Sequence, residues 1–214
     1  IDTGASFTLE TGSVREALRQ VLFAIAPSET RPEIAGAFLK FADSGLTMVG
    51  TDSFRLSERQ LKLKSEAPSP ASVIVPHRTM QEVSRILSQA EGDLSITVSE
   101  NQILFALDEV ELISRLIAGN FPDYAQIIPT ASKTTVMVAC EPLARAVKSA
   151  SLFCRSGLNH VTLQFSQDRV MVSASASSVG ENIIEVAAQI AGADTDIVFD
   201  YRFVLDGLNA LSES

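Results

Sequence analysis

The sequence has very little of the chemistry that disulfide bonding or metal binding requires. It holds two cysteines and two histidines in 214 residues. Cys140 and Cys154 flank an apparent helix, which would hold them far apart, so we expect no disulfide and the reducing conditions of a cytoplasm. Neither cysteine stands at zinc-site spacing from a histidine, and we therefore expect no metal.

Motifs of catalysis and nucleotide binding are also missing. There is no G-x-S-x-G elbow, no G-x-x-x-x-G-K-[ST] loop and no G-x-G-x-x-G turn. His77 opens a predicted helix and His160 precedes a predicted strand, each without a nucleophile beside it. The acidic residues of predicted turns, where Asp favours local backbone hydrogen bonds, are Asp43, Asp52, Asp93 and Asp108. We expect no catalytic residue and no cofactor, which disfavours an enzyme.

Long apolar runs and excess positive charge are the other absences. No run approaches the roughly 18 apolar residues that span a bilayer, and Asp2 and Glu10 interrupt any signal peptide. The formal net charge of −9 argues against binding nucleic acid through a generally basic surface, although it leaves local basic faces possible. Because the chain begins at Ile1 rather than Met, we expect it to belong to a longer polypeptide.

What the sequence does contain is an internal repeat. "FLKFADSGLTMVGT" (38–51) aligns with "TLQFSQDRVMVSAS" (162–175) at an offset of 124 residues. At the same offset "SVIVPHRTMQEVSRIL" (72–87) aligns with "DIVFDYRFVLDGLNAL" (196–211). With a small length change, 13–26 matches 142–155. The repeat predicts two modules of one fold, 1–128 and 129–214.

Hydrophobic periodicity predicts how the first module is built. Apolar residues at spacings of three and four predict helices over 13–26 and 76–90, and alternation predicts a strand over 94–99. Further strands are expected over 6–10, 36–42, 45–50, 56–64, 72–75, 102–107 and 109–117. The layout is α+β, with two helices on one face of antiparallel sheets. Counterparts of 94–117 would lie beyond residue 214, so we expect the second module to be incomplete at its C-terminus.

Positive charge gathers on the four predicted helices, 13–26, 76–90, 141–155 and 200–214. They hold eight Lys/Arg against six Asp/Glu, whereas the remaining residues hold nine against twenty. Basic residues recur at helical spacings on equivalent helices. An ordinary solvated face explains each helix separately, and a shared phosphate-facing surface explains the recurrence.

Four stretches resemble one known family. "VGTDSFRLSERQL", "SVIVPHRTM", "VELISRLIAGNFPDY" and "FVLDGLNAL" occur in order and, with the repeat, are similar to the bacterial DNA polymerase III sliding clamp, the beta processivity factor. The resemblance implies a DNA-clamp fold, with this chain as the middle module and most of the third. It also implies that two full-length subunits close into a homodimeric ring around duplex DNA without reading sequence. No membrane partner is expected.

The resemblance further implies a peptide-binding pocket for the polymerase III catalytic subunit, the clamp loader and repair proteins. Its expected residues are Ile34, Thr51, Ser53, Phe54, Arg55, Leu56, Pro122, Gln126 and Ile127. Ser53-Phe54 stands where the family usually has Gly-His, which changes the rim of the pocket. The open alternative is a turn in which Phe54 is tucked under its own module.

Two further surfaces follow from the resemblance. The expected DNA-facing residues are Arg15, Arg19, Arg31, Arg78, Arg85, Arg145, Lys148 and Arg202. Leu152 and Phe153 match apolar positions of the family's subunit interface, and core packing at a helix end is the alternative for both. The competing function is a clamp-like adaptor that binds partner peptides without encircling DNA.

Overall fold

The computed structural model describes residues 4–27, 30–43, 45–154, 157–177 and 180–211. The chain divides into two compact units, Ile1–Asp123 and Tyr124–Ser214. We call them unit 1 and unit 2 and describe each by itself. The division lies a few residues before the boundary expected after residue 128.

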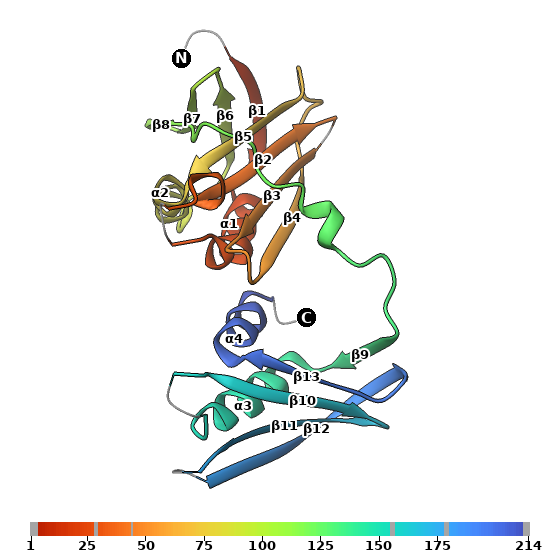
Figure 1. Cartoon of the computed structure of the whole chain (residues 1–214). Helices are drawn as coiled ribbons and strands as arrows, with labels where there is room; N and C mark the ends of the chain where they lie inside the picture. The colour runs from red at the N-terminus through yellow and green to blue at the C-terminus, as the bar shows by residue number, and fades with distance from the viewer. Residues whose placement is uncertain (1–3, 28–29, 44, 155–156, 178–179, 212–214) are drawn as a thin grey trace. The chain divides into compact units, whose positions relative to one another are not determined.

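Unit 1 contains two antiparallel four-stranded sheets and two helices (Figure 1). One sheet has the order β1-β6-β7-β8 and is built from β1 (Ala5–Glu10), β6 (Asp93–Val98), β7 (Gln102–Leu107) and β8 (Val110–Arg115). The other has the order β4-β3-β2-β5 and is built from β2 (Gly36–Ala42), β3 (Gly45–Thr51), β4 (Leu56–Lys62) and β5 (Ala71–Pro76). The helices are α1 (Thr11–Val21) and α2 (His77–Leu87).

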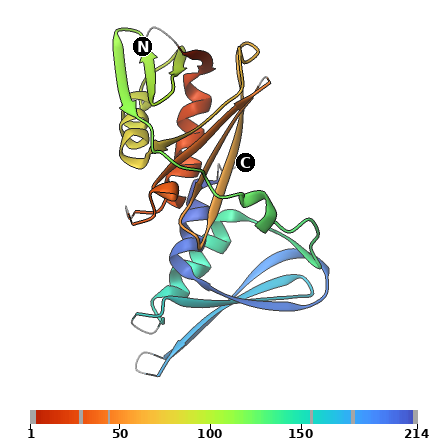
Figure 2. The ribbon, with the colours of Figure 1, turned by 45° about the horizontal axis from the view of Figure 1, so that its top comes forward.

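One hydrophobic core joins these elements of unit 1. Alternate residues of the strands and one stripe of each helix point into it, as the alternating and helical apolar patterns predict. Phe7 of β1 stacks on Phe41 of β2 with ring centroids 4.0 Å apart, so the core spans both sheets. From α1 and α2 the core takes Val14, Leu18 and Met80, each at most 1 % exposed. Figure 2 shows the two helices of this unit side by side.

Unit 2 repeats the first half of this plan around a single sheet. Its five strands have the order β13-β10-β11-β12-β9 and are β9 (Thr134–Val138), β10 (His160–Ser166), β11 (Arg169–Ala176), β12 (Gly180–Gly192) and β13 (Thr195–Asp200). The helices α3 (Cys140–Ser151) and α4 (Tyr201–Ala210) lie against one another on one side of the sheet (Figures 1 and 2). Its core is separate from that of unit 1.

The two units close their sheets differently at equivalent places. In unit 2, β12 is long enough to pair with β9 over five residue pairs, Ala188↔Val138 to Gly192↔Thr134. In unit 1, β4 ends earlier, and the amide of Lys64 donates one backbone hydrogen bond of 2.9 Å to the carbonyl of Thr8. The duplicated modules therefore share their element order and differ at this seam.

All four helices are shorter than the sequence predicted. The helix expected over 13–26 ends at Val21 and continues as a 3-10 turn, η1 (Leu22–Ala24). The physical reason is a close approach to β3, where a Cβ on Gly50 would lie 2.8 Å from the carbonyl oxygen of Val21. The amide of Ala26 then bonds the carbonyl of Thr51 at 3.1 Å. The helix α1 therefore ends at Val21, and the chain passes over β3 at Gly50, where no side chain obstructs it. The ends expected at residues 155 and 212–214 lie outside the described residues.

Candidate functional site

The turn between β3 and β4, residues 51–56, is held rigid by its own polar side chains. Asp52 Oδ1 accepts hydrogen bonds from the amides of Phe54 at 2.9 Å and Arg55 at 3.0 Å. Thr51 Oγ1 donates to the carbonyl of Arg55 at 2.8 Å and accepts from the amide of Ser53 at 3.2 Å. Ser53 has a φ of 78°, a left-handed conformation uncommon for a residue with a Cβ. The sequence T-D-S-F-R thus fixes its own backbone.

The underside of this turn packs on η1. Arg55 Nε donates to Asp52 Oδ2 at 3.0 Å, and its guanidinium lies 5.3 Å from the ring centroid of Phe23. Side-chain exposure is low for this pair, 20 % for Arg55 and 12 % for Asp52. A cation above an aromatic face adds attraction when both are partly desolvated. The close passage at Gly50 therefore also places Phe23 beneath the turn.

The upper side of the turn presents an aromatic ring to solvent. Phe54 is 82 % exposed, so the alternative in which it is tucked under its own module is wrong. Leu56, the next apolar residue, begins β4 and is partly buried. The turn therefore offers one exposed aromatic ring next to a partly covered aliphatic side chain.

Arg31 lies at this turn, although the sequence assigned it to DNA. Its Nη1 donates to Ser53 Oγ at 2.7 Å, and its Nε donates to Glu33 Oε1 at 3.2 Å. Arg31 precedes the 3-10 turn η2 (Pro32–Ile34), whose last residue, Ile34, is 2 % exposed and belongs to the buried core. The structure thus brings together Arg31 and the turn, and Ile34 is a buried residue three positions after Arg31.

The remaining expected pocket residues lie on the segment that follows β8. Pro122 is exposed, and Gln126 and Ile127 belong to the 3-10 turn η3 (Tyr124–Ile127). Ile127 is 71 % exposed. These residues carry apolar surface that faces solvent, and their role in closing a pocket stays a prediction.

The basic residues of the helices fall into three groups by their partners. Arg15 Nη1 donates to three carbonyl oxygens at the end of α2, those of Leu87 at 3.2 Å, Ser88 at 3.4 Å and Ala90 at 3.3 Å. This cation completes the C-terminus of a neighbouring helix, a favourable place for positive charge. The predicted phosphate contact therefore has a structural competitor at Arg15.

A second group consists of arginines paired with a carboxylate close by in sequence. The pairs are Arg19–Glu16 at 2.6 Å, Arg85–Glu82 at 2.7 Å, Arg145–Glu141 at 3.0 Å and Arg202–Asp200 at 2.6 Å. The hydrogen bonds that Arg19 donates to Glu16 raise the pKa of Arg19, and those that Asp200 accepts from Arg202 lower the pKa of Asp200. Arg78 and Lys148 form the third group, exposed cations for which the described residues provide no ion pair.

Leu152 and Phe153, at the end of α3, have different environments. Leu152 is 74 % exposed, whereas Phe153 packs against the core of unit 2. The core-packing alternative therefore holds for Phe153. Leu152 remains available for a subunit interface, which stays a prediction.

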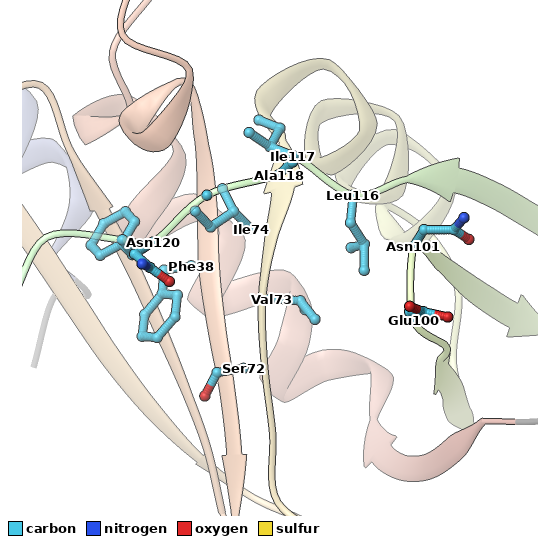
Figure 3. A pocket seen from close by; sticks show the side chains of 12 residues that line it. Phe38, Ser72, Val73, Ile74, Glu100, Asn101, Leu116, Ile117, Ala118 and Asn120 are labelled. Atoms are coloured by element: carbon cyan, nitrogen blue, oxygen red, sulfur yellow. The ribbon is translucent and has the colours of Figure 1, made fainter.

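An unanticipated cavity of about 440 Å³ lies on the outer face of β2 and β5 (Figure 3). The segment after β8 crosses this face, and the amide of Ile117 bonds the carbonyl of Ile74 at 2.9 Å. Phe121 then stacks on Phe38 with centroids 4.8 Å apart. A sequence signal existed, because Phe38 occupies an outward position between Ala37 and Leu39, which are fully buried.

The described residues also limit other chemistry. They contain no group of three or more His, Cys, Asp or Glu side chains placed to hold a metal ion. Burial lowers the pKa of His77 below its ordinary value. Among the same residues, every helix is too short or too polar to cross a bilayer.

Comparison with known proteins identifies the fold. Residues 8–123 match the model of the DNA polymerase III beta subunit central domain, and residues 125–214 match that of its C-terminal domain. The chain is 33 % identical over 215 residues to the beta sliding clamp of Bacillus subtilis, covering 99 % of this chain and 57 % of that protein. It is 31 % identical over 200 residues to that of Staphylococcus aureus, covering 92 % and 53 %.

Solved structures agree with the sequence comparison. The crystal structure of the Bacillus subtilis DNA polymerase sliding clamp superposes with a TM-score of 0.94 at 31 % identity, covering 99 % of this chain and 57 % of that one. The Thermotoga maritima DNA polymerase III beta subunit gives 0.89 at 26 % identity, covering 99 % and 57 %. The fold is therefore that of the sliding clamps, which confirms the predicted fold class.

The chain belongs to the DNA polymerase III beta subunit family, and it carries regions matching the central and C-terminal domains of that family. This confirms the resemblance found in the sequence. The chain spans about half the length of the curated relatives it matches.

Proposed function

We propose that this chain is the middle and third domains of a DNA sliding clamp, a non-enzymatic processivity factor. In its full-length form the clamp is a homodimeric ring that encircles duplex DNA without reading its sequence. It acts in the cytoplasm, where it tethers the polymerase III catalytic subunit, the clamp loader and repair proteins. Membership of the beta subunit family supports this proposal.

The observation that carries the peptide-binding part is the exposed ring of Phe54 on a rigid turn. Two amide hydrogen bonds to Asp52 fix the backbone that carries the ring. Its 82 % exposure leaves apolar surface for a partner. Binding sites concentrate their energy in a few well-placed aromatic and aliphatic anchors, and a preorganised backbone reduces the entropy lost on binding. Phe54 and Leu56 are the anchors contributed by this turn.

The DNA-binding part of the proposal rests on exposed cations, which contact phosphates and do not recognise particular bases. Exposed Arg and Lys side chains on helices bind phosphates through charge, and such contacts position a duplex without specifying bases. Arg78 and Lys148 are the strongest candidates because both are exposed and lack a carboxylate partner among the described residues. The overall net charge of −9 restricts this attraction to local faces.

The test of the peptide site measures binding of a fluorescent peptide taken from the clamp-binding segment of a polymerase III catalytic subunit. We expect Phe54→Ala and Leu56→Ala each to weaken binding by roughly tenfold or more, as loss of an anchor does. Ile113→Ala is the matched control, because Ile113 is a 56 % exposed aliphatic residue on β8, far along the chain from the turn. Unchanged affinity for both turn variants would exclude this peptide site.

In the alternative function, a clamp-like adaptor binds partner peptides at the same site but does not encircle DNA. The two functions differ in how the full-length protein is retained on DNA after loading. A ring stays on circular DNA and slides off linear DNA, whereas an adaptor shows no difference between them. Equal retention on both DNAs would favour the adaptor.

A further inference from the structure

The arginines of three helices share one arrangement with a glutamate of the preceding turn. Arg19 pairs with Glu16 on α1, Arg85 with Glu82 on α2, and Arg145 with Glu141 on α3. The spacing is three, three and four residues, which places both members of each pair on one helix face. The same device therefore occurs on both helices of unit 1 and on the first helix of unit 2.

The geometry of these pairs puts both charges at the surface. Glu16 receives two hydrogen bonds from Arg19, Nε to Oε2 at 2.9 Å and Nη2 to Oε1 at 2.6 Å. The side chains of Glu82 and Glu141 are 47 % and 66 % exposed, and those of their arginines are 75 % and 69 % exposed. Because the carboxylates are exposed, any anion that approaches these arginines also meets a negative charge.

We propose that Glu16, Glu82 and Glu141 weaken the grip of the clamp on DNA by competing with phosphates for the arginines beside them. This proposal rests on the proposed function and assigns a role to acidic residues of the helices. Each pair is neutral as a unit, so the attraction for a duplex comes mainly from Arg78 and Lys148. An exposed ion pair is worth only about 0.2 to 1 kcal/mol, so a phosphate can displace the carboxylate, which then repels it.

The consequence is weak and readily exchanged contact. Each phosphate neutralised by a cation releases counterions and adds about −0.9 to the slope of log K against log salt concentration. Helices on which these three arginines are already neutralised give a shallower slope and a faster exchange of contacts. Such a face suits a protein that moves along DNA while remaining associated with it.

The test compares two triple variants of the 214-residue chain that change net charge by the same amount. The first is Glu16→Gln, Glu82→Gln and Glu141→Gln. The control is Glu100→Gln, Glu109→Gln and Glu111→Gln, three exposed carboxylates outside the helices. Binding to a fluorescent 20-base-pair duplex is measured by anisotropy from about 20 to 150 mM salt, a range over which phosphate contacts are strongly salt-dependent.

We expect the helix variant to bind the duplex roughly three- to a hundredfold more tightly than the parent at low salt, from about 1.4- to fivefold per released arginine. Its salt slope should be steeper by about 2 to 3. The control should change affinity much less. An equal gain in both variants would show a general charge effect and overturn the inference, as would duplex binding by neither variant.

Failure of the inference is distinguishable from failure of the proposed function. If the parent chain binds the duplex and the helix variant binds no more tightly, the glutamates have no such role and the DNA contact stands. If Arg78→Gln and Lys148→Gln also leave binding unchanged, the proposed DNA surface fails as well. Peptide binding by the turn is measured separately and depends on neither result.

Discussion

Gly50 is the position at which an added methyl group should most disturb the turn proposed to bind peptides. A Cβ there would lie 2.8 Å from the carbonyl oxygen of Val21 and 2.9 Å from Cγ1 of Ile25. Both distances are shorter than real Cβ contacts, and the nearer atom is backbone at the end of α1. Gly50→Ala must therefore push η1 away from β3. Overpacking of this kind costs about 1 to 3 kcal/mol of the free energy of unfolding.

The displacement should also reach the turn. η1 carries Phe23, whose ring lies beneath the guanidinium of Arg55. We therefore expect Gly50→Ala to weaken peptide binding as well as stability. Urea unfolding followed by far-UV circular dichroism measures the first effect, and hydrogen exchange of the turn amides locates the second.

Gly45→Ala is the matched control in the same strand. Its Cβ would lie 3.4 Å from the nearest atom, an ordinary contact. We expect a change within about 0.5 kcal/mol, as for surface substitutions that disturb no special feature. If Gly50→Ala were as well tolerated as Gly45→Ala, the close crossing of η1 over β3 would be wrong.

Three other predictions follow from described contacts. Asp52→Ala should lower the free energy of unfolding by about 2 kcal/mol, because amide hydrogen bonds to a carboxylate are lost. Asp52→Asn keeps an acceptor and should cost less than half of that. Equal urea midpoints for the two variants would contradict the hydrogen-bond network of the turn. Phe153→Ala should destabilise unit 2 by roughly 2 kcal/mol or more, and Leu152→Ala should change stability little; denaturant titration of both variants distinguishes a core residue from a surface one. Arg202 holds the pKa of Asp200 below its ordinary value of 3.8, so the pair stabilises the fold above that pH and the stabilisation is lost as pH falls through the lowered pKa. Asp200→Asn should flatten the acid side of the stability profile, and an unchanged profile would count against the pair.

The sequence predicted the fold well because the internal repeat indicates the two modules and the apolar periodicities indicate the strands and helices within them. The order of strands and helices in 1–128 was anticipated with shifts of a few residues at their ends. Helix ends were the main error, since the end of α1 depends on a crossing strand and on Gly50, which lie about 30 residues away in sequence. The apolar periodicity of a segment depends on that segment alone, so it does not predict a contact with a distant strand.

For the candidate site, the sequence identified residues that lie together in the structure, and their functional roles stay predictions. Thr51 to Leu56 were found as a group because they are contiguous. Arg31 was assigned to DNA because the resembled family approaches DNA at this loop, whereas its hydrogen bond to Ser53 spans 22 positions. Arg15 was assigned to DNA because it shares a helix face with Arg19, whereas its carbonyl partners lie more than 70 positions away. Long side chains reach partners that spacing on one helix cannot reveal.

The unequal seams of the two modules have a consequence for how each one opens. A junction of five residue pairs between β12 and β9 must separate cooperatively. Among the described residues of the first module, the segment after β4 is joined to β1 by the backbone hydrogen bond from Lys64 to Thr8. Local opening is easiest where the fewest backbone bonds must break together. We therefore expect local opening at this junction to require less free energy in the first module than at the equivalent place in its duplicate.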